Sequence, residues 1–384
     1  MIFSTTLDLT PGQTVARSVY GKDNHLLMKR GYELTLSSIA LLTELTISGI
    51  YLEEEGTDDI CPTDVVEPES RIKCQNALER AFAGLQKGAS NGKRVMVNPA
   101  QIEAATREMV GSLLDAQKPV LAMLDLRSEN NALFQHSVGC SVLASLLGKE
   151  MKLADDMIRQ LAMGMVFHDF GQTLQPASLY AKKGTLTDAE RKTVQEHPRL
   201  GFRKAMEDDL LSPLAAYVVL RHHERVDGQG YPDGIKGDDF KRIGRIAALV
   251  EVYDTIISLR PYAPQQMPDY AVKQVLCETG TAFDKEAGVA LVKCVAVYPT
   301  GCAVRLNTGE SGLVVSTEHG KTTRPLVRLF YNEDNSRRTP EDVQLDRSDG
   351  RCIILSGMSL EKVRRAKVSL PKISIADELD QLAA

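Results

Sequence analysis

Residues 155–171 read DDMIRQLAMGMVFHDFG, and the pattern of this stretch predicts a helix. Its apolar side chains recur at the helical period, which places them on one face. The resulting stripe consists of Met157, Leu161, Met165 and His168. Gly171 is typical of a residue that ends a helix. Since helical patterns dominate from about residue 71 to residue 297, we expect a mainly α-helical protein.

Capping signals indicate where further helices begin. Asn98–Pro99 and Ser212–Pro213 each place a capping side chain before a proline that suits the first helical position. Thr187 and Glu190 have the spacing of a capping box, which opens the stretch TDAERKTVQEH. These signals support the helical interpretation of this part of the chain.

Two smaller regions flank the helices. Residues 1–60 mix short β-like runs with one helical stretch, which predicts a small α+β module. Residues 61–70 are polar and carry two prolines, as a linker does. After Tyr298 the period changes to two, and Asn307–Thr308–Gly309 is a hairpin signal. We therefore expect residues 298–384 to form a small β-rich tail with a mobile or loosely docked C-terminal extension.

Composition excludes several classes of protein. The 384 residues suit two to three domains, and a hydrophobic fraction of 43% allows a substantial core. A formal charge of −5 argues against a partner that is a nucleic acid polymer. Seven scattered cysteines predict a reducing cytoplasm, not a disulfide framework. The chain lacks an apolar run of about 18 residues and an N-terminal secretion signal, so we expect no membrane span.

The chemistry is expected at the histidines. The chain has seven of them, and five lie between positions 136 and 223. Glu251 interrupts the apolar run IGRIAALVEVYDTII. Burying a carboxylate beside several imidazoles costs several kcal/mol unless a cation or hydrogen bonds compensate. Because imidazole and carboxylate together are common ligands of transition metals, the cluster predicts a metal site. His25 and His319 lie in polar turns outside it, and we expect no role for them.

Two motifs sharpen this prediction. His168–Asp169 offers an imidazole beside a carboxylate that can bridge two ions, and a pair of ions about 3.5–4 Å apart suits phosphodiester hydrolysis. The second motif is RHHERVDGQGYPDG, residues 221–234, in which glycines force a loop beside two consecutive histidines. Such a loop lets the backbone approach a ligand closely.

Taken together, HD (residues 168–169), HP (197–198), HHE (222–224) and DGQGYP (227–232) resemble the HD-GYP family of cyclic dinucleotide phosphodiesterases. The resemblance covers about residues 125–290. It implies a catalytic helical bundle of the HD superfamily, preceded by a regulatory module and followed by a β-rich segment.

The resemblance also implies a two-metal site with seven ligands. His168 and Asp169 would be the catalytic pair. Glu251 stands where the family has an aspartate, with Asp254 one turn later as the alternative. The implied metal ligands are His136, His168, Asp169, His197, His222, His223 and Glu251. The implied substrate-binding residues are Arg260, Tyr231, Gly230 and Gln172. Glu224 is either an orienting partner of one imidazole or a surface carboxylate.

Three positions depart from the family pattern. Gln172 stands where the family has a lysine that contacts phosphate. Its loss removes a charge-assisted hydrogen bond that contributes roughly 1.5–3 kcal/mol to phosphate binding. Ala263 replaces a residue that is often basic. Ala132 stands where some members carry a third-metal glutamate, so two ions are expected here.

The implied function is hydrolysis of cyclic di-GMP to linear pGpG, and to GMP after a second cut. Cyclic GMP-AMP is an alternative substrate. A second alternative is a degenerate member that binds the dinucleotide or a partner protein without cleaving. A third is a nucleotide hydrolase of the wider superfamily, against which the GYP loop argues. The implied cofactors are two divalent ions, iron or manganese, with Zn, Ni, Mg and Ca as alternatives. The implied protein partner is a GGDEF-type or other signalling protein that binds at the GYP loop. The sequence does not indicate whether the chain forms oligomers.

Overall fold

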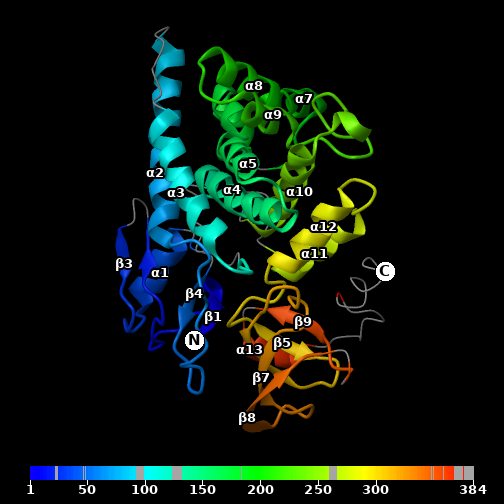
Figure 1. The fold of residues 1–384 in the computed structure, drawn as a ribbon. Helices are drawn as coiled ribbons and strands as arrows, with labels where there is room; N and C mark the ends of the chain where they lie inside the picture. Colours follow the sequence, from blue (N-terminus) through cyan, green and yellow to red (C-terminus); the bar gives the residue numbers. More distant parts are fainter. Residues whose placement is uncertain are drawn as a thin grey trace.

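Three parts make up the chain in this computed structural model (Figure 1). A helical domain lies above two smaller modules, one at each end of the chain. The structure describes residues 1–21, 25–45, 47, 49–91, 99–122, 132–182, 184–258, 266–346, 348, 350–357, 359–366 and 375. Asn98, Arg260 and Ala263 lie outside the described residues, as does nearly all of the expected C-terminal extension.

The N-terminal module contains two small antiparallel sheets and one helix. β1 pairs with β4, and β2 pairs with β3. Thr35 caps α1 in a capping box with Ser38. The elements are β1 (Ile2–Thr5), η1 (Thr6–Asp8), β2 (Val19–Tyr20), β3 (Leu26–Met28), α1 (Leu36–Glu44) and β4 (Gly49–Leu52). Their apolar side chains form a core of their own, around Val15, Leu42 and Ile50.

The expected linker is docked against both neighbours. α2 already begins at Pro68, inside the range 61–70. Val66 is buried in the core of the helical domain, and Ile60, just before the range, is buried against the C-terminal module. Although this stretch is mostly polar, Val66 within it and Ile60 just before it pack against the two neighbouring parts of the chain.

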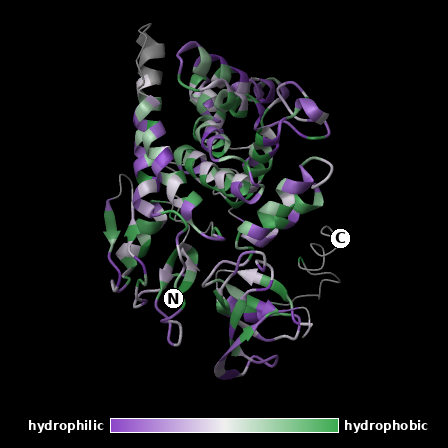
Figure 2. Ribbon diagram, viewed as in Figure 1, coloured by the Kyte–Doolittle hydropathy of each residue, from purple (hydrophilic) through white to green (hydrophobic). Residues whose placement is uncertain are grey.

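The helical domain confirms the predicted fold class. Its helices are α2 (Pro68–Asn91), α3 (Pro99–Asp115), α4 (Ala132–Glu150), α5 (Asp155–Phe167), α6 (Ala177–Tyr180), α7 (Asp188–Gln195), α8 (His197–Glu207), α9 (Pro213–Arg221), α10 (Arg242–Ile257), α11 (Pro268–Cys277) and α12 (Lys285–Cys294), with short turns η4 (Phe170–Leu174) and η5 (Gly237–Asp239). α4 is central, since its residues from His136 to Gly148 are buried almost without interruption. Figure 2 shows apolar stretches along the central helices and polar loops at the edge of the domain. The buried side chains of these helices form one core, which continues into the C-terminal module through residues such as Val304 and Leu329.

The capping signals hold where the structure describes them. The side chain of Ser212 accepts a hydrogen bond from the backbone of Ala215, and Thr187 with Glu190 forms a capping box. The prediction that Gly171 ends a helix is wrong. α5 ends at Phe167, and Gly171 lies inside η4, where its lack of a side chain serves close packing.

The C-terminal module is a five-stranded antiparallel sheet with the order β8-β7-β6-β5-β9. The strands are β5 (Ala303–Leu306), β6 (Ser311–Ser316), β7 (Leu326–Tyr331), β8 (Arg337–Gln344) and β9 (Ile353–Gly357), followed by α13 (Leu360–Arg365). The hairpin between β5 and β6 turns at Gly309, whose φ of +90° suits glycine. Arg328 on β7 binds Asp59 with two hydrogen bonds of 2.6 and 2.8 Å, so the two modules touch.

Among the described residues, the helices do not include one with both the length and the apolar character needed to cross a membrane.

Candidate metal centre

The histidine and carboxylate side chains converge where several helices begin or end. His168 and Asp169 directly follow α5, while His222 and His223 directly follow α9. His197 is the first residue of α8. His136 lies in the first turns of α4, and Glu251 lies in the middle of α10. Side chains that are up to 115 residues apart thus meet inside the helical domain.

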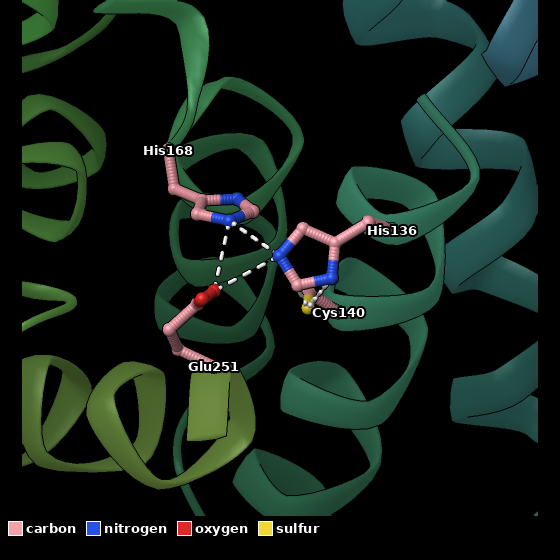
Figure 3. A group of neighbouring side chains, drawn as sticks. All are labelled: His136, Cys140, His168 and Glu251. Carbon is pink, nitrogen blue, oxygen red and sulfur yellow. Dashed lines mark hydrogen bonds and ion pairs between the residues drawn. The ribbon is translucent and has the colours of Figure 1, made fainter. Parts of the chain in front are cut away.

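A first group of donor atoms surrounds Glu251 (Figure 3). Oε2 of Glu251 lies 3.0 Å from Nε2 of His136 and 3.0 Å from Nε2 of His168. The two imidazole Nε2 atoms are 3.2 Å apart. Cys140 lies beneath the His136 ring, with Sγ 3.5 Å from Nδ1, and sequence reasoning did not identify it as part of this group. The first group is completely buried.

A second group lies on the other side of Asp169. Oδ1 of this carboxylate is 3.3 Å from Nε2 of His197 and 3.9 Å from Nε2 of His222. The second oxygen, Oδ2, is 3.6 Å from Nε2 of His168 in the first group. The donor atoms of Asp169, His197, His222 and His223 all lie within 4.8 Å of one another. Asp169 therefore directs one oxygen into each group, as a carboxylate that bridges two cations does.

Backbone carbonyls fix how three imidazoles are oriented. In each case Nδ1 lies within hydrogen-bond distance of the carbonyl three residues earlier: 2.6 Å for His168, 2.8 Å for His197 and 2.8 Å for His222. Since a carbonyl can only accept, Nδ1 carries the proton. The Nε2 atoms then face the centre, which is how metal-binding imidazoles are held.

One carboxylate oxygen of Asp169 lacks a hydrogen-bond donor among the described residues. Its Oδ1 is buried and accepts no hydrogen bond among the described residues. Nε2 of His197 lies 3.3 Å from this oxygen, while Nδ1 of the same ring faces the carbonyl oxygen of Val194 at 2.8 Å. Buried atoms of this kind require a compensating positive charge. A divalent cation fits this donor set, because imidazole and carboxylate are its usual ligands.

The electrostatics of the first group favour positive charge. Burial raises the pKa of Asp169 and of Glu251, yet the adjacent imidazoles hold both pKa values well below the ordinary range. Burial likewise opposes charge on His136, but Cys140 and the carboxylates beside it raise its pKa well above the usual value. The pKa of His168 is raised by Asp169 and Glu251 against the effect of burial. Protonated imidazoles therefore compensate the buried carboxylates in this group, and a bound cation would supply the same positive charge.

The second group is different, since the pKa values of His222 and His223 are lowered. Burial and the neighbouring imidazoles lower the pKa of His222 well below its ordinary value. Burial also lowers the pKa of His223 to about 3. Neutral imidazoles are the form that binds metals, so the lowered pKa values of His222 and His223 favour the entry of a cation.

Two glycines allow the two halves to meet. A Cβ atom on Gly171 would lie 1.9 Å from the carbonyl oxygen of His197. Gly201 on α8 is also closely packed, although less severely, since its Cβ would lie 3.1 Å from the backbone nitrogen of Gly171. The turn that follows Asp169 therefore packs directly on the backbone of α8, and this contact positions His197.

Glu251 and Asp254 have different places, which the sequence alone left open. Glu251 faces the centre, whereas Asp254 lies on the outer side of His136, with Oδ2 2.5 Å from Nδ1. Ser258 donates a hydrogen bond of 2.9 Å to the same carboxylate oxygen. Asp254 thus orients the imidazole and is not placed as a ligand.

We expect Asp254→Asn to weaken metal binding roughly 10- to 100-fold, the usual effect of losing a carboxylate behind a ligating histidine. The asparagine amide is neutral, and only its oxygen can accept a hydrogen bond, whereas both oxygens of the Asp254 carboxylate can. Isothermal titration of Mn²⁺ into the metal-free chain measures this effect. Asp156→Asn, on the exposed start of α5, is the matched control, and equal affinities in the two variants would contradict the orienting role.

The loop after α9 is held by Glu224. This carboxylate is buried and accepts backbone hydrogen bonds from Asp233 at 2.8 Å and Ile235 at 3.2 Å. Neither sequence-based reading of Glu224 is correct, because it binds loop amides and not an imidazole or solvent. Tyr231 stacks on His223, with ring centroids 4.5 Å apart. A Cβ atom on Gly230 would lie 2.5 Å from Cα of Glu224, so packing within the loop requires this glycine.

The positions of the remaining predicted residues do not define a role in the centre. Gln172 lies in η4 and is half-buried, three residues beyond Asp169. Arg260 and Ala263 lie outside the described residues. His319, to which no role was assigned, belongs to a separate group with Glu150 and Cys294.

Comparisons with known proteins show which family and which relatives the chain is similar to. Residues 119–287 match the family model of the HD domain. The chain is 31% identical to a cyclic di-GMP phosphodiesterase of Pseudomonas aeruginosa over 64% of this chain and 59% of the relative. It is 28% identical to a cyclic di-GMP phosphodiesterase response regulator of Xanthomonas campestris, over 62% of each chain. It is also 28% identical to a 3′3′-cGAMP-specific phosphodiesterase of Vibrio cholerae, over 76% of this chain and 65% of the relative. The chain therefore spans less than two thirds of the length of each of these relatives.

Proposed function

Because this chain belongs to the HD-GYP family of HD domains, we propose that it is a metal-dependent phosphodiesterase that opens cyclic di-GMP to linear pGpG. The observation that carries the proposal is Asp169, whose two oxygens face two separate groups of imidazoles. Its buried Oδ1 lacks a hydrogen-bond donor among the described residues and needs a cation.

The proposed cofactors are two divalent ions, iron or manganese, with zinc, nickel, magnesium and calcium as alternatives. Asp169 would bridge them. The proposed ligands of one ion are His136, His168 and Glu251, and those of the other are His197, His222 and His223. When bound, such ions ionise water near neutral pH and neutralise phosphate charge.

The residues of the chain prepare the site for this chemistry. The carbonyls behind three imidazoles hold the Nδ1 atoms and turn the Nε2 atoms towards the centre, so the donor set is oriented before substrate arrives. Tyr231, stacked on the half-buried His223, is placed at the edge of the centre and is our candidate for a contact with the substrate. Gly230, Gln172 and Arg260 remain proposals from the sequence.

In the proposed reaction, a water oxygen forms a bond to phosphorus while the bond from phosphorus to the 3′ oxygen of the ring breaks. The leaving oxygen takes a proton from water or from a group outside the ligand set. A second cut of the linear dinucleotide would yield GMP. Cyclic GMP-AMP is the alternative substrate, and the name of the Vibrio cholerae relative supports testing it.

The test is a direct assay. The purified chain, loaded with Mn²⁺ or Fe²⁺ under anaerobic conditions, is incubated separately with cyclic di-GMP and with cyclic GMP-AMP, and the products are separated by chromatography. We expect pGpG from cyclic di-GMP. A panel of nucleoside mono- and triphosphates tests for the wider superfamily activity, and exclusive hydrolysis of that panel would overturn the proposal.

One observation favours a protein that binds without cleaving. Gln172 stands where the family pattern has a lysine that contacts phosphate, so the site lacks one positive charge. Retained binding of cyclic di-GMP without product, in chain that carries both metals, would establish this second function.

Gln172→Lys separates a slow enzyme from one that does not cleave. We expect it to raise kcat/KM roughly tenfold or more, because a charge-assisted hydrogen bond to phosphate contributes about 1.5–3 kcal/mol. Steady-state kinetics at two salt concentrations measure the change. Gln101→Lys, exposed on α3, adds the same charge far from the site and should leave the rate unchanged. An unchanged rate in Gln172→Lys would show that this position does not contact the substrate.

A further inference from the structure

A second cluster of donor atoms lies outside the centre described above. Glu150 is the last residue of α4, Cys294 is the last residue of α12, and His319 follows β6 in the C-terminal module. Their donor atoms all lie within 4.8 Å of one another. The three residues come from two different parts of the fold, so the cluster spans the junction between the helical domain and the C-terminal module.

The distances in this cluster are close to those of a zinc site. Nε2 of His319 is 3.1 Å from Oε2 of Glu150 and 4.0 Å from Sγ of Cys294. Around a tetrahedral zinc ion, these nitrogen–oxygen and nitrogen–sulfur pairs would be about 3.3 Å and about 3.6 Å apart. Shifts of a few tenths of an ångström, which side-chain rotations supply, would convert one arrangement into the other.

Charge and burial also fit a divalent cation. Cys294 is fully buried, and Glu150 and His319 are both about four-fifths buried. A thiolate, a carboxylate and a neutral imidazole together would neutralise two positive charges. Lys293 binds the other oxygen of Glu150, Oε1, at 3.2 Å and leaves Oε2 to the cluster. Burial and the Glu150 carboxylate raise the pKa of Cys294 to about 12, so a bound cation would have to displace the proton of this thiol.

The surrounding structure presents His319 to the other two residues and leaves a way in. The turn that carries it is docked on the end of α12, where the backbone nitrogen of Gly320 donates to the carbonyl of Lys293 at 3.1 Å. Thr322 donates to the carbonyl of Val292 in the same region. His319 also lines a cavity of about 750 Å³, bordered by the segment after Ile60 and by the residues that follow α3. A cation and a water ligand can reach the cluster from this cavity.

We propose that Glu150, Cys294 and His319 form a binding site for a zinc-type divalent cation that fastens the C-terminal module to the helical domain. Three protein donors leave one tetrahedral position for water or for a group that enters the cavity. The sulfur donor selects zinc and cobalt over magnesium and calcium. This site is independent of the proposed hydrolytic centre, whose ligands contain no sulfur.

Cobalt tests the proposal, because a cobalt–thiolate bond gives a charge-transfer absorption in the near ultraviolet that histidine and carboxylate ligands do not give. Co²⁺ is titrated into the metal-free full-length chain, and absorption and bound metal are both measured. We expect the thiolate band in the wild type. We expect Cys294→Ser to lose the band together with one equivalent of bound cobalt, and His319→Gln to weaken cobalt binding at this site at least tenfold.

Three controls make the result specific. Cys277→Ser removes an exposed thiol, and Cys140→Ser removes the thiol beside the other centre, and both should retain the band. Asp169→Asn should also retain it, so failure of the hydrolytic proposal would leave this one standing. Circular dichroism checks that each variant is folded. Absence of the band in the wild type, or its persistence in folded Cys294→Ser, would refute the site, and loss in Cys140→Ser alone would assign the sulfur to the other centre.

Discussion

Asp169→Asn should abolish hydrolysis, with a loss of at least about 10³-fold in kcat. Substitutions behind a ligand already cost 10- to 100-fold, and Asp169 is proposed to contact both ions directly. The amide has one oxygen, so it cannot direct an acceptor into each group as the carboxylate does. Metal analysis of the purified variant, alongside turnover of cyclic di-GMP, measures both losses.

Thermal unfolding provides a second readout for this variant. A ligand that binds only the folded state raises its stability in proportion to the logarithm of its concentration over Kd. We therefore expect Mn²⁺ to raise the Tm of the wild type and to have a much smaller effect on Asp169→Asn. Asp156→Asn, on the exposed start of α5, is the matched control and should behave as the wild type. Full metal content with full activity in Asp169→Asn would refute the bridging role.

The sequence predicted the helical domain and the members of the cluster for different reasons. Helical periodicity and caps such as Ser212 act locally, so they can be read from neighbouring residues. The convergence of the histidines could not be obtained from spacing alone. A carboxylate such as Glu251 within an apolar helical pattern indicated a cluster, and the resemblance to the HD-GYP family implied its members.

The strands at the two edges of the C-terminal sheet were not predicted. β8 is mostly exposed and polar and contains Pro340, so it has no apolar alternation to detect. β9 pairs with β5, about fifty residues earlier in the chain, and this pairing is set by the tertiary fold. An edge strand of this kind can be identified only when the strand that pairs with it is known.

The sequence also failed to resolve roles within one helix. Glu251 and Asp254 are three residues apart, so both lie on the same side of α10. Which of them faces the metal depends on where the His136 ring lies between them, and α4 determines this. His319 was given no role because it lies in a polar turn outside the histidine cluster, and its partners Glu150 and Cys294 are distant in sequence.

Gly171→Ala should both destabilise the chain and impair the centre. The added methyl group would lie 1.9 Å from the carbonyl oxygen of His197, and the nearest atoms are all backbone. Side-chain rotation cannot relieve this contact, so η4 or α8 must move. Overpacking of this kind costs about 3 kcal/mol or more where the backbone must shift. Denaturant unfolding of the metal-free chain measures the loss.

The same movement would separate the Asp169 turn from His197. A displacement of about 1 Å at a catalytic centre can lower the rate about 10²-fold, so we expect a loss of that order even where the variant remains folded. Gly111→Ala is the matched control, because Gly111 lies inside α3 with no atom within 4 Å of the added Cβ. It should stabilise the chain by about 0.5–1 kcal/mol, as alanine does inside helices, without changing activity. If Gly171→Ala matched this control in stability and rate, the contact between η4 and α8 would not be what brings the two halves of the centre together.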